Sequence, residues 1–195
     1  MMAPRSFDRY SDGELVDLCN GGGRREAIHA FEALYRRHRD YVTRVSLRFG
    51  ADHGIAGDVL QETFLYLLKK FPPTGDGLVL SAQLRSLLYP VAKSLTLSAL
   101  RRRERFEGSD VLDPDRHAET RGAGPEDGDL ARLLSGLTSL SIEHREVLLL
   151  RFVDDLSLNE IAEVLSIPLG TVKSRLHLAV KKLKSHPRIK RLKKS

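Results

Sequence analysis

A run of hydroxyl-bearing and basic side chains near the C-terminus has the composition of a surface that reads DNA. The residues are Thr171, Lys173, Ser174, Arg175 and His177, followed by Lys181. Short hydroxyl groups allow a helix to approach the major groove closely, arginine can donate two hydrogen bonds to guanine, and lysine neutralises phosphate. The alternative is a solvated helical hairpin whose lysines and arginines are ordinary surface residues.

The sequence around this run predicts a helix, a tight turn and a second helix. It reads LSLNEIAEVLSIPLGTVKSRLHLAVKKLK over residues 156–184. Ser157 and Glu160 form a capping box that starts the first helix, and Pro168 suits the start of the second. Ser166 stands where such motifs commonly have glycine. Apolar residues recur at helical spacing in the second helix, and the positions expected to face inward are Val172, Leu176, Ala179 and Leu183.

The overall composition is that of a soluble globular protein. Of 195 residues, 41% are hydrophobic and 30% are charged, which is typical of one large or two small folded domains. The apolar runs are shorter than the roughly 20 residues that a membrane-spanning helix needs, and the first residues lack the apolar core of a secretory signal. The sequence therefore predicts a cytoplasmic protein without a membrane span.

The single cysteine and the scattered histidines limit the chemistry that the chain could perform. Cys19 is the only cysteine, which excludes an internal disulfide and a cysteine-cluster metal site, and we expect it to be a small packing residue. Neither His29 nor His38 has neighbours suited to holding a metal. No nucleophile, carboxylate pair or phosphate-binding glycine loop is assembled. We therefore expect no catalytic site, no metal and no cofactor.

Positive charge is placed unevenly along the chain. The formal net charge is +6, and basic residues gather at Arg101–Arg103 and in residues 173–194, on either side of an acidic stretch from Glu104 to Asp129. Two basic surfaces with an acidic spacer suggest a polyanion that is contacted twice. The alternative is that lysine-rich segments serve solubility, but the second basic cluster overlaps the helix described above.

The N-terminal half predicts four helices. A capping box at Ser11 and Glu14 starts the first, and the glycines at 21–23 end it. The others span residues 24–49, 53–71 and 80–103, and Pro90 should kink or break the last of them. Their inward-facing positions include Ala27, Ile28, Phe31, Leu34, Tyr35, Tyr41, Val42, Val45 and Phe49, then Ala56, Val59, Leu60, Phe64, Leu67, Leu68 and Phe71, and finally Leu84, Leu87, Leu88, Val91, Leu95 and Leu100.

The remaining segments complete an all-α organisation of two small helical domains. The third helix carries Asp58, Gln61 and Glu62 on its polar side, a candidate docking surface. The sequence PPTGDG after it forms a loop. Residues 104–128 contain few large apolar residues and predict a flexible acidic linker between domains at 1–103 and 129–195. Helix should resume near Asp129, with Leu130, Leu133, Leu134 and Leu137 inward, and again after Ser141, with Val147, Leu148 and Phe152 inward.

Two stretches carry a more specific resemblance. They read GDVLQETFLYLLKKF at 57–71 and LTSLSIEHREVLLLRFVDDLSLNEIAEVLSIPLGTVKSRL at 137–176. In this order and spacing they resemble a bacterial RNA polymerase sigma factor of the extracytoplasmic-function (ECF) group, over nearly the whole chain. The resemblance implies that 1–103 is the domain called region 2 and that 129–195 is region 4, a helix-turn-helix domain with a basic tail. It also implies core RNA polymerase, double-stranded and melted promoter DNA, and an anti-sigma protein as partners.

The resemblance also assigns roles to particular residues. The family's polymerase-docking motif falls on Asp58, Gln61, Glu62 and Phe64. The loop at 72–79 corresponds to the one that captures a flipped base of the minus-ten element, and the residues concerned are Pro73, Thr74, Gly75 and Asp76. The fourth helix would follow the separated strand with the basic residues Lys93, Arg101, Arg102 and Arg103. The positions that read the minus-thirty-five element are Thr171, Lys173, Ser174 and Arg175.

The fourth helix departs from the family pattern. The chain has no tryptophan, whereas the family commonly has one near the start of this helix. Ser94 and Ser98 stand where relatives commonly carry asparagine and aspartate, and Pro90 is also unusual there. These changes bear on base preference or strand melting at the minus-ten element.

Two other functions fit parts of the same pattern. A free-standing helix-turn-helix repressor or activator would bind its operator without polymerase, and residues 58–64 would then be ordinary helix surface. A sigma-like decoy would only bind an anti-sigma protein. Such a decoy would have no need of Lys173 and Arg175, although the changes at Ser94 and Ser98 would suit it.

Overall fold

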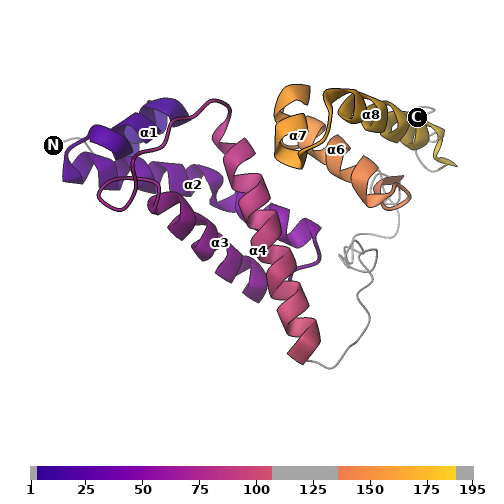
Figure 1. Cartoon of the computed structure of the whole chain (residues 1–195), viewed down its shortest axis with the longest axis horizontal. Coiled ribbons are helices and arrows are strands. Elements are labelled where there is room, and N and C mark those ends of the chain that lie inside the picture. Colours follow the sequence, from indigo (N-terminus) through magenta and orange to yellow (C-terminus); the bar gives the residue numbers. More distant parts are fainter. Residues whose placement is uncertain (1–3, 107–135, 188–195) are drawn as a thin grey trace. The chain divides into compact units, whose positions relative to one another are not determined.

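All regular structure in the part of the chain that could be described is helical, which confirms the predicted all-α class. The computed structural model describes residues 4–106 and 136–187. The chain divides into two compact units, Met1–Leu112 and Asp113–Ser195 (Figure 1). Within the described ranges, every helix is too short or too polar to cross a lipid bilayer.

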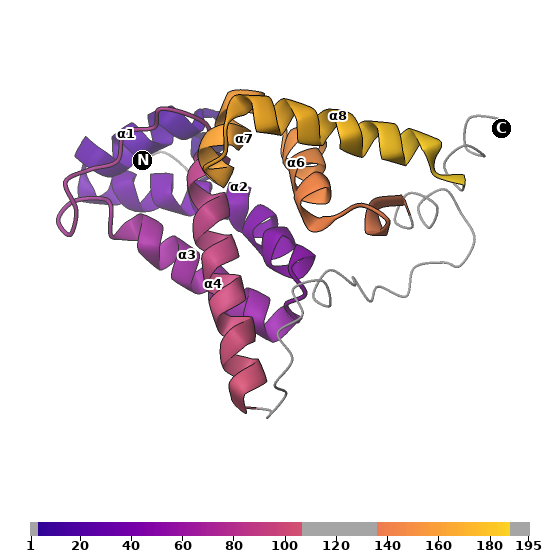
Figure 2. The same cartoon turned by 45° about the vertical axis from the view of Figure 1, so that its right-hand side comes forward.

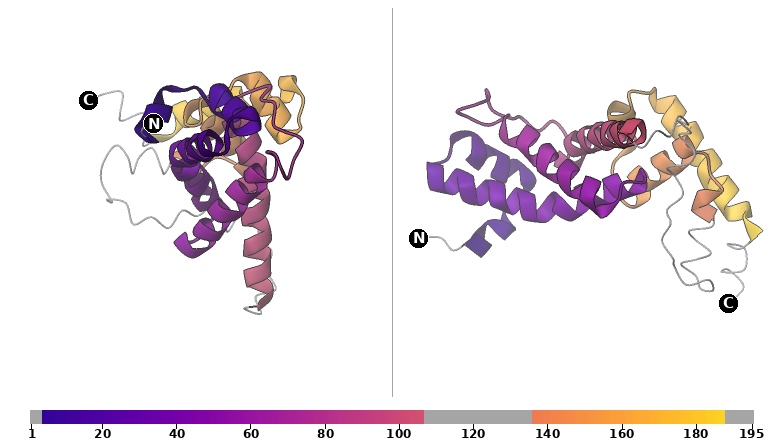
Figure 3. Two further views of the ribbon diagram at one scale, coloured as in Figure 1. Left: turned by 90° about the vertical axis from the view of Figure 1, so that its left-hand side faces the viewer. Right: turned by 90° about the horizontal axis from the view of Figure 1, so that it is seen from below.

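The first unit is built around one long helix. A 3-10 helix η1 (Pro4–Arg9) and helix α1 (Asp12–Gly21) precede α2 (Arg24–Arg48), which packs against η1, α1, α3 (His53–Leu68) and α4 (Leu84–Phe106). The predicted capping box at Ser11 and Glu14 is confirmed, with the Ser11 amide 2.7 Å from the Glu14 carboxylate. The last turns of α4 project past the ends of α2 and α3 (Figures 1 and 3).

An aromatic cluster joins α2 to α3 and to the loop that follows. The Phe31 ring meets Phe64 and Phe71 edge-on, with ring centroids 6.2 Å apart in both pairs. Tyr35 lies one turn further along α2 and contacts Phe64 at a centroid distance of 4.9 Å. Edge-to-face pairs of this kind contribute about 0.5–1.5 kcal/mol each beyond the area they bury. The cluster therefore fixes both the rotation of α3 and the point where its chain turns away.

Helix α4 differs from the prediction at both ends and in its middle. It begins at Leu84 rather than near residue 80, and it continues through Glu104–Phe106, which we predicted as the start of the linker. Arginine and glutamate are good helix formers, so the arginine run carries the helix onward. Pro90 lies inside α4 without breaking it. An interior proline costs about 3 kcal/mol, and buried residues on both sides of Pro90 hold the helix together: Leu84, Leu88, Tyr89, Ala92, Thr96 and Leu100.

Three positions that we predicted to face inward are wrong. Ile28 is 57% exposed, Leu68 is 47% exposed and Phe152 is 64% exposed. Helix α3 also ends at Leu68, so Phe71 is buried from the following turn rather than from the helix. These helices carry apolar residues on more than one side, and periodicity alone does not select which side meets the core.

The second unit is a compact arrangement of three described helices. They are α6 (Ile142–Phe152), α7 (Leu158–Leu165) and α8 (Leu169–Ser185), and α6 packs against both others (Figure 2). The capping box at Ser157 and Glu160 is confirmed. The fully buried side chains that join the helices belong to Val147, Leu150, Leu156, Ile161, Val172 and Ala179.

Some predictions lie outside the described residues. They are the linker from residue 107, the helix expected to resume near Asp129 with Leu130, Leu133 and Leu134, and the basic tail beyond residue 187. At the start of the described part of the second unit, Arg145 of α6 donates hydrogen bonds to the carbonyls of Leu137, Thr138 and Leu140. These bonds tie the segment before α6 onto that helix.

A buried histidine ties the start of α1 to the middle of α2. The Nε2 atom of His38 lies 2.8 Å from one carboxylate oxygen of Asp12, and Arg37 donates to the other at 2.6 Å. Burial raises the pKa of Asp12, but the hydrogen bonds and charges of His38 and Arg37 outweigh it, and the pKa lies below its ordinary value of 3.8. A carboxyl with a lowered pKa in the folded state stabilises the fold above its unfolded pKa, and this contribution is lost as the pH falls through the lowered value.

Replacing this carboxylate should weaken the first unit and change its response to acid. We expect Asp12→Asn to reduce the free energy of unfolding at pH 7 by about 2 kcal/mol, because two charge-assisted hydrogen bonds are weakened. The difference from wild type should begin to shrink as the pH falls below about 4, where the unfolded carboxyl is protonated, and should be lost as the pH falls through the lowered pKa of the folded carboxyl. Calorimetric unfolding across pH 3–7 measures this, with Asp17→Asn at an exposed position of α1 as the control. An equal loss of stability for both variants would contradict it.

Candidate functional site

The turn between α7 and α8 takes a defined form that needs a left-handed residue. Ser166 has φ 53° and ψ 44°. The Ile167 amide donates to the carbonyl of Ala162 and the Ser166 amide to that of Glu163, which together make a Schellman motif at the end of α7. A residue other than glycine in this conformation costs about 1–2 kcal/mol. Ser166 therefore occupies the position where we noted that glycine is common, in the conformation for which glycine is usually chosen.

Helix α8 presents the predicted basic and hydroxyl residues to solvent. Its buried side consists of Val172 and Ala179, with Leu176 and Leu183 half-buried as predicted. The exposed side chains are those of Lys173, Ser174, His177 and Lys181, while Thr171 and Arg175 are half-buried. The Ser174 hydroxyl donates to the Thr171 carbonyl at 3.0 Å, which leaves its oxygen able to accept a further hydrogen bond.

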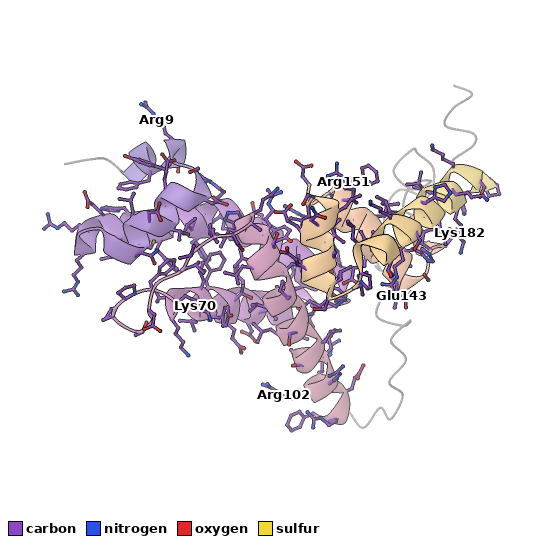
Figure 4. The ribbon with its side chains drawn as sticks, turned by 45° about the horizontal axis from the view of Figure 1, so that its top comes forward. Arg9, Lys70, Arg102, Glu143, Arg151 and Lys182 are labelled. Atoms are coloured by element: carbon purple, nitrogen blue, oxygen red, sulfur yellow. The ribbon has the colours of Figure 1, made fainter. Side chains whose placement is uncertain are left out.

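Glu143, at the start of α6, lies within electrostatic reach of Arg175. The pKa of Glu143 is lowered, first by its own backbone amide and by the Ser141 hydroxyl, and further by the charge of Arg175. Figure 4 labels Glu143 in the second unit. The negative charge of Glu143 and the positive charge of Arg175 therefore attract each other on the surface of the second unit.

The predicted docking motif on α3 divides into surface and core. Asp58, Gln61 and Glu62 are exposed on one side of the helix. Phe64 is only 4% exposed and belongs to the aromatic cluster with Phe31 and Tyr35. The assignment of Phe64 as a contact residue is therefore corrected: its ring holds α3 in place and is not available to a docked protein.

The loop between α3 and α4 is anchored by its own backbone and by α1. The amides of Thr74 and Gly75 donate to the Phe71 carbonyl, and the Gly77 amide donates to the Lys70 carbonyl at 3.0 Å. Pro73, Thr74 and Asp76 are exposed, Gly75 is half-buried, and the peptide bond between Pro72 and Pro73 is cis. The loop passes beside α1 (Figures 1 and 2), where the Asn20 side chain hydrogen bonds to it.

The basic residues of α4 are not equivalent. Arg101 and Arg102 are exposed, and Figure 4 shows Arg102 near the free end of the helix. Arg103 instead donates to Asp52, the N-cap residue of α3, at 2.7 Å. This differs from the prediction for Arg103, because a DNA phosphate would have to compete with the Asp52 carboxylate. Lys93 is half-buried with its ammonium 5.4 Å from the centre of the Phe49 ring.

Several positions that shape these surfaces had no role in the sequence prediction. Asn20 and Asp52 hold the loop and the end of α4 through contacts that span 58 and 51 residues of sequence. Asp52 was detectable in part, because an aspartate before a helical run is a typical N-cap. No pattern in the neighbouring sequence indicated a role for Asn20. Ser94 and Ser98, where the chain departs from the family pattern, lie exposed on α4.

Comparison with known proteins identifies both units. The family profile described as Sigma-70 region 2 matches residues 34–106, and the one described as Sigma-70, region 4, matches residues 136–185. The ECF RNA polymerase sigma factor SigL of Mycobacterium tuberculosis is 35% identical over 156 residues, which cover 78% of this chain and 85% of SigL. The chain belongs to the ECF sigma factors. SigW of Bacillus subtilis, another member, is 28% identical over 160 residues, covering 76% of this chain and 83% of SigW.

Solved structures agree with the fold of this ECF sigma factor. The sigma factor RpoE of Bartonella quintana, in complex with the anti-sigma factor NepR, matches with a TM-score of 0.61 and 22% identity, over 82% of this chain and 97% of RpoE. CnrH, in complex with the cytosolic domain of CnrY, matches with a TM-score of 0.57 and 24% identity, over 89% of this chain and 95% of CnrH. Sigma factors act in transcription initiation and are not enzymes, so the family assignment requires no catalytic residue in this chain.

The division of the α3 motif predicts different outcomes for neighbouring substitutions. We expect Phe64→Ala to lower the free energy of unfolding by about 3–5 kcal/mol, because it removes a buried ring that packs against Phe31 and Tyr35 and leaves a cavity. Leu65→Ala should change it by less than about 1 kcal/mol, because Leu65 is half exposed. Chemical denaturation measures both. Equal stability of the two variants would show that the ring of Phe64 is not part of the core.

Proposed function

We propose that this ECF sigma factor binds core RNA polymerase and directs initiation at promoters that it recognises at two elements. Helix α8 reads the minus-thirty-five element as duplex, and the loop at 72–79 with α4 captures and follows the minus-ten element once it opens. The observation that carries the proposal is the arrangement of α8. Its Val172 and Ala179 side is buried, and its hydroxyl and basic side chains point away from the core at the start of the second helix of a helix-turn-helix.

The first unit supports the second half of the proposal. Its loop presents Pro73, Thr74 and Asp76 to solvent on an anchored backbone, and the projecting end of α4 carries Arg101 and Arg102. A flipped base costs a few kcal/mol of stacking, so contacts in the loop must return a similar amount for the right base only. Exposed arginines suit the phosphates of the separated strand, whatever its sequence.

Polymerase would dock on the exposed side of α3. Asp58, Gln61 and Glu62 form a surface of carboxylate and amide groups that is free of the helix's own core contacts. Such a surface suits a partner with basic and hydrogen-bonding groups. By analogy with RpoE and CnrH, whose structures were solved with NepR and CnrY, we also propose an anti-sigma protein as a partner. The protein would act in the cytoplasm, where polymerase and chromosome are found.

Transcription with purified core polymerase tests the proposal directly. On a fragmented genomic library, the protein should give discrete RNA starts that share two upstream elements, and core polymerase alone should not. Glu62→Arg should lose core binding and most starts while unfolding at the wild-type temperature, because Glu62 is exposed. DNA binding without any core association would favour the free-standing regulator, and anti-sigma binding without starts would favour the decoy.

Substitutions at two residues of α8 should distinguish a contact with a base from a contact with a phosphate. We expect Arg175→Ala to cost about 1–3 kcal/mol in discrimination between the correct and altered minus-thirty-five elements, because arginine would contact a base edge. Lys181→Ala should weaken binding evenly across sequences and reduce the salt dependence by about one phosphate contact. Binding of the holoenzyme to matched and altered promoters over a range of salt concentrations measures both. Equal losses on specific and random DNA for both variants would contradict the assignment.

A further inference from the structure

The nitrogen and the oxygen of the Asn20 side-chain amide both form hydrogen bonds with one residue of the loop, Leu78. Its Nδ2 donates to the Leu78 carbonyl at 2.7 Å, and its Oδ1 accepts from the Leu78 amide at 2.8 Å. Asn20 is the second-last residue of α1, and the contact spans 58 residues of sequence. A pair of hydrogen bonds to one backbone unit fixes its orientation as well as its position, because the amide and carbonyl of Leu78 must both face α1.

The loop is shaped to accept this contact. Gly77 has φ +97°, and a Cβ atom there would come 3.2 Å from the Oδ1 of Asn20. At Gly75 a Cβ atom would come 2.4 Å from the Lys70 carbonyl oxygen, so the loop lies directly against the end of α3 as well. Both glycines are needed for the close approach. The exposed residues Pro73, Thr74 and Asp76 are therefore held between an attachment to α3 and an attachment to α1.

We propose that Asn20 is a positioning residue for recognition of the minus-ten element. It holds the loop in the shape that receives the flipped base, without touching DNA itself. The inference rests on the proposed function, because it concerns the same loop. A pocket discriminates between bases only if its contacts are in place before the base arrives, since a mobile loop would spend binding energy on its own ordering. Residue 79, directly after the attachment, is already 89% exposed, so the attachment ends at Leu78.

The chemistry of the amide provides graded variants. Asn20→Ala removes both hydrogen bonds. Asn20→Asp keeps an acceptor for the Leu78 amide but places a carboxylate oxygen against the Leu78 carbonyl. It should therefore fail to hold the loop against α1. Gly77→Ala acts from the loop side, through its positive φ and its approach to Asn20. Asp17→Ala, at an exposed position one turn earlier in α1, is the matched control.

The experiment combines hydrogen exchange of the free protein with transcription by the holoenzyme. In Asn20→Ala, exchange at the Leu78 amide should accelerate about tenfold, as expected for the loss of two hydrogen bonds to one residue. Transcription is then measured on a promoter from the genomic library and on versions altered at each minus-ten position. Transcription from the correct promoter, divided by transcription from the altered promoters, should fall about threefold or more in Asn20→Ala, Asn20→Asp and Gly77→Ala. In the double variant Asn20→Ala/Gly77→Ala, this ratio should fall no further than in either single variant. Asp17→Ala should behave as wild type.

Other readouts separate positioning from a loss of folding and from failure of the proposed function. Core binding and discrimination at the minus-thirty-five element should stay unchanged in every variant, which a merely unstable protein would not achieve. The variants Thr74→Ala and Asp76→Ala test the loop itself. If they lower minus-ten discrimination and Asn20→Ala does not, the positioning role is overturned and the proposed function stands. If neither loop variant nor Asn20→Ala changes it, the loop does not read the minus-ten element, and both ideas fall.

Discussion

The edge-on packing of Phe31 against Phe64 and Phe71 determines most of what the first unit can present. Phe64 sets the rotation of α3 about its axis, and this rotation puts Asp58, Gln61 and Glu62 on the outside. Phe71 is buried by the same ring and marks where the chain leaves α3, and its carbonyl accepts the bonds that start the loop. One aromatic contact therefore positions both the surface that we propose for polymerase docking and the loop that we propose for base capture.

The second unit achieves its geometry with a different kind of constraint. Backbone hydrogen bonds at the end of α7 and the left-handed conformation of Ser166 set the direction in which α8 leaves the turn. The cost of about 1–2 kcal/mol for a left-handed serine is small beside the burial of Ile161, Val172 and Ala179, which requires that direction. Tertiary packing thus determines the conformation of the turn, and a glycine is not required at position 166.

The sequence predicted what depends on neighbours in the chain and missed what depends on distant contacts. Both capping boxes, at Ser11 and Ser157, were correct because the partners lie three residues apart. Ile28, Leu68 and Phe152 were wrong because apolar residues occur on several sides of their helices, and the prediction could not see which side meets another element. The burial of Phe64 was predicted from its spacing. The family motif nevertheless placed it among the contact residues, which shows that a motif can mix residues that bind with residues that support.

The candidate site followed the same division. The exposure of Lys173, Ser174 and His177 was visible from helical period, since Val172 and Ala179 mark the opposite side. The attachment of Arg103 to Asp52 and of Asn20 to Leu78 was not, because each joins helices or loops far apart in sequence. Such contacts decide which charged residues are available and which loops are rigid, and they appear only when the helices are assembled.

The environment of Cys19 makes its thiol slow to react with oxidants. The thiol is buried between α1 and α2, with its sulfur 3.7 Å from the Ala27 carbonyl oxygen, and burial raises the pKa of Cys19 to about 12. At neutral pH only about one thiol in a hundred thousand would then be ionised. Peroxides and disulfides react with thiolates. Cys19 is therefore a poor target for a thiol-based oxidative signal, because its buried thiol stays protonated at neutral pH.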